Sequence, residues 1–206
     1  SLVGTTIKDP ALLPEHIGCD EKHTRRMGDK HYCATTVADG CVLGAAVAES
    51  AGQKNLEAAY GVFQQEAQAV DPDYSPKTGN VDGWPATRGA LTALFPEITI
   101  IMCFLHVFIG IRDRCSKKFK ETFCVCAQKL WDCYRAETKR SFSQRVRRLV
   151  QWVQNNEVPD VMKQKIEKLR ANLPFFTKAY DFVGSLRTSN MIDRLMQRMD
   201  RHLFAG

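Results

Sequence analysis

The sequence predicts an α/β fold, with a mixed β-sheet flanked by helices and an all-α insertion before the last helix. Three observations predict it. Runs of β-prone residues crowd the first half of the chain, apolar residues at helical spacing separate the later runs, and strand signals vanish beyond residue 107. A chain of 206 residues with 44% hydrophobic content can bury the core of one domain that carries an insertion.

Three β-prone runs open the chain. They are expected to form antiparallel strands at residues 17–23, 31–37 and 41–47. The second and third runs are separated only by Ala38-Asp39-Gly40, and a short link that contains glycine predicts a hairpin there. Residues 1–16 contain Pro10 and Pro14 and little periodicity, so we expect a linker or arm.

Helices and strands then alternate. Helical spacing predicts a helix over residues 55–70, and Pro85 suits the first turn of a second helix that ends before Phe95-Pro96. Two more strands are expected, one leading into Asp82 and one over residues 98–105. The order of three strands, helix, strand, helix, strand and then helices is that of an RNase H-like fold.

The expected organisation has three parts after the arm. They are an RNase H-like core over residues 17–106, a basic helical insertion over 107–187, and a final core helix over 188–206. Thr188 or Ser189 can cap that last helix. Because the chain starts at Ser1 without an initiator Met, we expect it to be a fragment of a longer protein.

Composition bounds the class of protein. The net charge of +6 favours a polyanionic partner, although a solvated surface rich in Lys and Arg gives the same balance. No apolar run is long enough for a membrane span and no signal peptide is visible, so no membrane partner is expected. Four of the eight cysteines lie in apolar runs, where free thiols pack as small hydrophobes: Cys19, Cys33, Cys41 and Cys103. We expect a reduced protein in the cytoplasm or on the nucleoid, or in the nucleus of a eukaryote.

Two carboxylates follow from the strand pattern. Asp20 lies near the end of the first expected strand and Asp82 at the end of the fourth. If these strands are neighbours, the two side chains meet at one edge of the sheet, and a bound cation offsets their repulsion. Hard carboxylate oxygens suit Mg²⁺ or Mn²⁺. Glu21 and Asp29 compete with Asp20 for the first position.

A third acid is expected on the last helix. Asp193 lies off the apolar stripe about one turn from the helix start, and Asp200 shares its face. Asp193 is therefore the predicted third ligand and Asp200 the alternative. An acid near a helix N-terminus also complements the helix dipole without binding any metal, and that interpretation stays open.

Several short motifs carry a family resemblance. They are Asp20-Glu21, Val81-Asp82-Gly83, Phe95-Pro96, Cys103-x-x-His106 and Ser189-Asn190-Met191-Ile192-Asp193-Arg194. In order and spacing they resemble the catalytic core of a DDE transposase. The Cys-x-x-His step is similar to the C/D-x-x-H motif of Mutator-like and related insertion-sequence transposases, and the helical segment resembles the insertion such enzymes place before the last acid.

The resemblance implies DNA transposition by metal-dependent strand cleavage and transfer. Asp20, Asp82 and Asp193 would bind Mg²⁺ or Mn²⁺, with element ends and target DNA as partners and a homo-oligomer on paired ends. Asp193 stands where the family usually has Glu, a side chain one methylene longer. This departure leaves open a catalytically impaired, transposase-derived DNA-binding protein. A separate alternative is another RNase H-like nuclease such as a resolvase or ribonuclease H, which the long basic helical segment before the third acid disfavours.

Cys103 and His106 allow more than one interpretation. His106 is expected near the active site as an auxiliary catalytic residue, and a satisfied core histidine is the alternative. The pair could also bind zinc if further cysteines supplied ligands. A thiol nucleophile with a histidine base is disfavoured, because residues three apart in the expected strand point to opposite faces.

The helical segment is basic and carries aromatic residues. Its candidate nucleic-acid contacts are Arg140, Arg145, Arg147 and Arg148. Arginine–phosphate contacts give salt-sensitive affinity that is largely independent of sequence. We expect the arginines outside and the aromatic residues inside this segment. Trp84, just after the second acid, could line the site or belong to the core.

Overall fold

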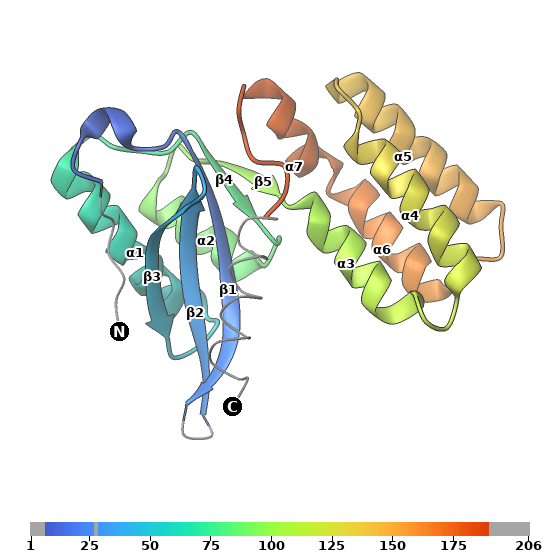
Figure 1. The fold of residues 1–206 in the computed structure, drawn as a ribbon, viewed down its shortest axis with the longest axis horizontal. Coiled ribbons are helices and arrows are strands. Elements are labelled where there is room, and N and C mark those ends of the chain that lie inside the picture. Colours follow the sequence, from blue (N-terminus) through green and yellow to red (C-terminus); the bar gives the residue numbers. More distant parts are fainter. Residues whose placement is uncertain (1–6, 27–28, 190–206) are drawn as a thin grey trace. The chain divides into compact units, whose positions relative to one another are not determined.

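The computed structural model describes residues 7–26 and 29–189 of the 206-residue chain. It divides into two compact units (Figure 1). Among the described residues, the first contains 7–26, 29–102 and 184–189, and the second is Cys103–Val183. The predicted third acid Asp193, its alternative Asp200 and the final helix lie outside the described residues, although Thr188 and Ser189 are described and are not helical.

The first unit is built on a mixed five-stranded sheet in the order β3-β2-β1-β4-β5. Its strands are β1 (His16–Arg26), β2 (Asp29–Ala38), β3 (Cys41–Ala48), β4 (Thr78–Val81) and β5 (Thr99–Met102). The first three strands pair antiparallel, whereas β4 is parallel to both β1 and β5. This arrangement confirms the predicted α/β class and is compatible with an RNase H-like fold.

The hairpin between β2 and β3 has the predicted short link. Ala38 pairs with Cys41, so Asp39 and Gly40 form a two-residue turn. Both have positive φ, 49° and 80°. Two consecutive residues in the left-handed region match the twist of the flanking strands, and Asp-Gly is a favoured sequence for such a turn.

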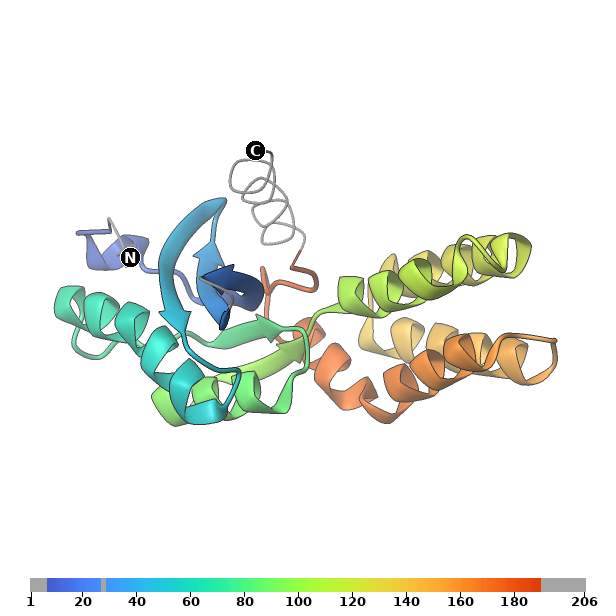
Figure 2. The ribbon, with the colours of Figure 1, turned by 90° about the horizontal axis from the view of Figure 1, so that it is seen from below.

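Helices α1 (Gln53–Val70) and α2 (Pro85–Leu94) lie side by side against one face of the sheet (Figure 2). The predicted apolar stripe of α1 is buried, namely Leu56, Ala59, Tyr60, Phe63 and Ala67. Phe63 packs within 6.0 Å of Tyr74 and 6.5 Å of Phe95, measured between ring centroids. This layer fixes the strands that carry the candidate acids.

The predicted strand over residues 98–105 is wrong at its C-terminal end. Strand β5 stops at Met102, Cys103 is the N-cap residue of α3 (Phe104–Cys115), and His106 lies in its first turn. A continuous apolar run does not distinguish a buried strand from the start of a buried helix. Helical spacing of the apolar residues becomes visible only over the whole of α3, whose buried positions are Phe104, Ile111 and Cys115.

The second unit is all-helical within the described residues. After α3 come α4 (Lys120–Tyr134), α5 (Lys139–Gln154), α6 (Asp160–Ala171) and the short α7 (Leu173–Thr177). Helices α3 to α6 each pack against the next, and α6 returns to α3. Phe104, Phe142 and Phe176 form an aromatic core with centroids 5.9 to 6.5 Å apart. A capping box of Thr138 and Ser141 starts α5.

Two short 3₁₀ helices complete the described structure, Pro10–Leu12 and Lys178–Asp181. The first falls within the residues expected to be an arm. None of the helices described is long and apolar enough to span a membrane.

Candidate active site

Asp20 lies in β1, and Asp82 directly follows β4, the parallel strand next to it. The pairing of β1 with β4 joins His16 to Thr78, Ile17 to Gly79, and Gly18 to Asn80. Continuing this register by two residues brings Asp20 opposite Asp82, the first residue after β4. Because side chains alternate along a strand, Asp20 shares a face with His16, whereas Ile17 and Cys19 are buried on the other face.

Local backbone geometry fixes the Asp82 carboxylate. Its Oδ1 accepts a hydrogen bond from the backbone N–H of Trp84 at 2.6 Å, a turn that aspartate side chains commonly make. Gly83 between them has a φ of +96°, and a Cβ there would collide with the end of the Met102 side chain. The acid is followed by glycine because only glycine adopts this conformation without strain.

Asp20 is positioned by β1 itself. It pairs with Thr35 of β2, is half-buried, and its Oδ1 accepts the backbone N–H of Glu21 at 3.0 Å. Its competitor Asp29 pairs with Arg26 at the far end of the same hairpin. Six strand residues separate the two positions, a distance of roughly 20 Å. Asp29 therefore does not reach Asp82.

Glu21, the other competitor, faces the helices and not the Asp20 side of the sheet. Its Oε1 accepts hydrogen bonds from the Tyr60 hydroxyl at 2.5 Å and from Thr87 Oγ1 at 2.8 Å. Burial raises the pKa of Glu21 to about 7, although the two hydrogen bonds act to lower it. The nearby carboxylates of Asp82 and Asp20 raise the pKa further. Three carboxyl groups thus lie near one another where β1 passes the end of β4.

The described chain returns to this face just before the predicted third acid. Asn80 donates its side-chain N–H to the backbone carbonyl of Leu186 at 2.9 Å. Gly184 lies against the ring of His16, whose Nδ1 is 2.9 Å from Thr78 Oγ1. Ser189 is 3% exposed. Residues 184–189 thus cross the face that carries Asp20, and Asp193 follows four residues after the last of them.

The donor set fits a hard divalent cation in part. Asp20 and Asp82 supply carboxylate oxygens, which Mg²⁺ and Mn²⁺ prefer. No group of three or more His, Cys, Asp or Glu side chains that could hold a metal occurs among the residues described. Further ligands would therefore have to come from water, substrate or residues outside that set, such as Asp193.

Cys103 and His106 have no third His, Cys, Asp or Glu close enough to complete a zinc site in the described part of the chain. All eight cysteines are free thiols in this structure; of the four expected to pack in apolar runs, Cys19 and Cys103 are buried, whereas Cys33 is half-buried and Cys41 is exposed. The stated reason for disfavouring a Cys103–His106 catalytic pair was wrong, because the two residues lie at the start of a helix and not in a strand. Residues three apart on a helix are neighbours. His106 belongs to the helical unit, and its auxiliary role stays a prediction.

The four predicted arginines all lie on α5. Arg140, Arg147 and Arg148 are exposed, and Arg145 is half-buried. Phe142 and Leu149 are each 1% exposed, which places the apolar residues of this helix inside as expected. In the first unit, Trp84 is 52% exposed, so it is not a core residue.

Three polar residues around the acids were missed by the sequence analysis. Tyr60 was recognised only as part of an apolar stripe, although a buried tyrosine hydroxyl needs a partner and here donates to Glu21. Thr87 gave no signal. Asn80 could have been noticed, because asparagine is depleted in strands and stands fully buried in β4.

No family model and no curated protein matches the chain. Among solved structures, one similar chain belongs to the cryo-EM structure of a simian T-cell lymphotropic virus intasome in complex with PP2A regulatory subunit B56 gamma. The identity is 13% and the TM-score 0.33, over 82% of this chain and 52% of that one. The protein thus spans about half the length of the chain it matches (52%), and a likeness this low carries no argument about function.

Proposed function

We propose that the protein is the catalytic domain of a DNA transposase, which cleaves phosphodiester bonds at element ends and transfers the strands to target DNA with Mg²⁺ or Mn²⁺. The observation that carries this proposal is the parallel pairing of β1 with β4. Its register, if continued for two residues past Gly18 and Asn80, would set Asp20 opposite Asp82. The motif resemblance of the sequence supplies the reaction class, and the sheet order is compatible with it.

In this proposal the chain's residues hold and orient the reacting groups. Asp20 and Asp82 bind the cation, with Asp193 as the third ligand and His106 as an auxiliary. A cation held there would supply Lewis-acid activation of a water or a 3′-hydroxyl and charge stabilisation of the leaving oxygen. The Trp84 N–H holds one oxygen of Asp82, which leaves the other carboxylate oxygen for the cation. The Asn80–Leu186 bond supports the segment that leads to Asp193.

The helical unit supplies DNA affinity in this proposal. Four arginines on α5 would contact backbone phosphates: Arg140, Arg145, Arg147 and Arg148. The net charge of +6 supports a polyanionic partner. A homo-oligomer on paired ends is part of the same proposal, since joining two ends to a target needs two active sites.

Cleavage and joining of DNA by the purified chain test the proposal. The substrate carries the terminal sequences of the encoding element, and the reaction is run with Mn²⁺ and then with EDTA. Asp20→Asn and Asp82→Asn should each abolish the Mn²⁺-dependent products. Asp29→Asn is the matched control, because it removes the same charge at the far end of the hairpin and should leave them unchanged. Products that persist in Asp82→Asn contradict the proposal.

A second candidate is a catalytically impaired DNA-binding protein derived from such an enzyme. Asp193, shorter than the family's usual Glu, favours it. This candidate predicts DNA binding without any Mn²⁺-dependent product, and recovery of cleavage in Asp193→Glu would identify the short side chain as the cause. Cleavage of RNA–DNA hybrids without joining would instead indicate another RNase H-like nuclease.

A further inference from the structure

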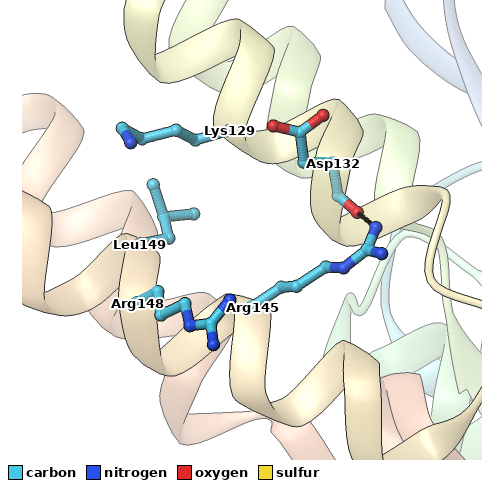
Figure 3. Close-up of a pocket in the computed structure, with 5 residues that line it drawn as sticks. All are labelled: Lys129, Asp132, Arg145, Arg148 and Leu149. Carbon is cyan, nitrogen blue, oxygen red and sulfur yellow. Dashed lines mark hydrogen bonds between the residues drawn. The ribbon is translucent and has the colours of Figure 1, made fainter.

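A cavity of about 320 Å³ lies in the helical unit between α4 and α5 (Figure 3). Lys129 and Asp132 line it from α4, and Arg145, Arg148 and Leu149 from α5. Its volume is at the lower end of the range of small-molecule pockets, ~300–1,000 Å³. Three cationic side chains and one carboxylate therefore surround a space that a single small anionic group can enter.

Arg145 is held in place before any ligand arrives. Its guanidinium donates to the backbone carbonyl of Asp132, the contact drawn as a dashed line in Figure 3. The bond joins the side chain of α5 to the main chain of α4. Only one of the five guanidinium N–H groups is needed for it, so others remain to donate to an anion.

The single acid of the cavity is already bonded. Asp132 Oδ1 accepts from Gln128 Nε2 at 3.0 Å and forms an ion pair with Arg135 at 3.1 Å. Neither Gln128 nor Arg135 lines the cavity. The Asp132 charge is therefore partly compensated from outside, and the cationic side chains dominate within.

Arg148 and Lys129 face the cavity without an acidic partner in the described part of the chain. Five other cations of this unit do have one: Arg112, Arg135, Lys139, Lys163 and Arg170. The Lys129 ammonium lies 5.5 Å from the centre of the Trp152 ring, a cation–π contact that orients it.

We infer that this α4–α5 cavity is a discrete binding site for one phosphate group of a nucleic-acid backbone, held by Arg145, Arg148 and Lys129. Leu149, which also lines the cavity, is a buried core residue of α5, 1% exposed. The choice of nucleic acid rests on the proposed function. The site itself rests only on the geometry of the cavity, and it makes Lys129 a contact that the arginine pattern did not indicate.

Binding of a fluorescent DNA duplex to the full-length chain tests this site. It is measured by anisotropy in EDTA, so that no chemistry occurs. Arg148→Gln and Lys129→Gln should each weaken binding about tenfold, as expected for loss of a charge-assisted hydrogen bond. Each should also lower the slope of log affinity against log salt by about one. Arg145 is left intact because its bond to α4 also supports the fold.

Lys117→Gln is the matched control. It removes one exposed charge from the same unit, outside the cavity, and should change affinity less than about twofold. An equal loss in Lys117→Gln and Arg148→Gln would show a diffuse charge effect and overturn the site. Titration with inorganic phosphate is the second arm: phosphate binding that depends on Arg148, combined with unchanged DNA affinity in Arg148→Gln, overturns the nucleic-acid ligand.

The two proposals fail separately. Asp82→Asn removes the proposed catalysis and should leave the Arg148-dependent affinity in EDTA unchanged. Loss of cleavage in the unmodified chain, with that affinity retained, would count against the transposase proposal and not against the phosphate site. Unchanged unfolding temperatures for Arg148→Gln and Lys129→Gln exclude a folding defect as the cause of weaker binding.

Discussion

Asn80 donates its side-chain amide to the backbone carbonyl of Leu186, a residue 106 positions further along the chain, at 2.9 Å. The bond joins β4, two residues before Asp82, to the segment that leads to Asp193. Asn80 is fully buried, and its Oδ1 has no hydrogen-bond partner among the residues described. The Asn80 side chain thus joins the strand that leads to Asp82 to residues 184–189, which follow the helical unit.

Replacing Asn80 should loosen this connection. Asn80→Ala removes the donor to Leu186 and should lower the free energy of unfolding by about 1–3 kcal/mol, measured by urea denaturation. Limited proteolysis should also cut residues 184–189 faster. The control is Asn156→Ala, because Asn156 is exposed and donates to the Trp152 carbonyl one helical turn away. Equal losses in the two variants would show that the Asn80 bond is unimportant.

Glu21 should make stability depend on pH. Burial raises its folded-state pKa to about 7 from the ordinary 4.5 of a glutamate, so between these values the folded chain keeps a proton that the unfolded chain releases. Stability from this group is full below pH 4.5 and falls as pH rises to about 7, by at most about 3 kcal/mol. Urea denaturation from pH 4 to 8, in EDTA, should show that decline and its loss in Glu21→Gln. Parallel curves for both proteins would contradict the prediction.

Gly83 should tolerate no side chain without cost. Gly83→Ala places an L-residue at a φ of +96° and a Cβ against Met102, so we expect a loss of about 1–3 kcal/mol and weaker Mn²⁺-dependent cleavage. Gly61→Ala is the control, because Gly61 lies within α1 and its added Cβ would make an ordinary 3.6 Å contact with Leu94. That change should stabilise the protein by about 0.5–1 kcal/mol. Destabilisation of similar size in both would argue against the backbone explanation.

The cysteines should fall into two reactivity classes. Burial raises the pKa of Cys126 and of Cys133 to about 12, whereas Cys41 and Cys124 are exposed. A thiol reagent at pH 8 should modify the exposed pair first, because the thiolate is the reactive form. Mass spectrometry of peptides from briefly treated protein checks this. Early modification of Cys126 or Cys133 in the folded chain would contradict their burial.

Trp84 lies two residues after the candidate acid Asp82 and is exposed to solvent. Its backbone N–H donates to Asp82 Oδ1, and the residue is 52% exposed. We expect Trp84→Ala to leave the unfolding free energy within about 0.5 kcal/mol, as for surface substitutions, while DNA cleavage falls. Retained cleavage would show that the indole is unrelated to the substrate.

Local patterns predicted much of the first unit. The helix after Asp82 was expected over residues 85–94 and is Pro85–Leu94, because proline and the Phe95-Pro96 step mark its two ends. The boundary at Met102 was missed because apolarity continues from β5 into α3. The position of Asp82 followed from a strand that ends in an acid and a glycine, a signal contained in a few consecutive residues.

Contacts between distant residues could not be predicted in the same way. Nothing in the sequence near Glu21 shows that Tyr60 and Thr87 will bond it, and nothing near Asn80 indicates Leu186. Such pairs depend on how α1, α2 and the returning segment pack on the sheet. The cationic cavity likewise required the pairing of α4 with α5, since the arginine pattern alone lacks Lys129.

The most direct measurement is a crystal structure of the protein soaked in Mn²⁺, with anomalous scattering used to locate the ion. We expect a peak in contact with carboxylate oxygens of both Asp20 and Asp82, at about the 2.1 Å typical of a small hard divalent ion. It also predicts that Asp82→Asn abolishes that peak. A peak that neither side chain contacts, or none at saturating Mn²⁺, would contradict the shared metal site.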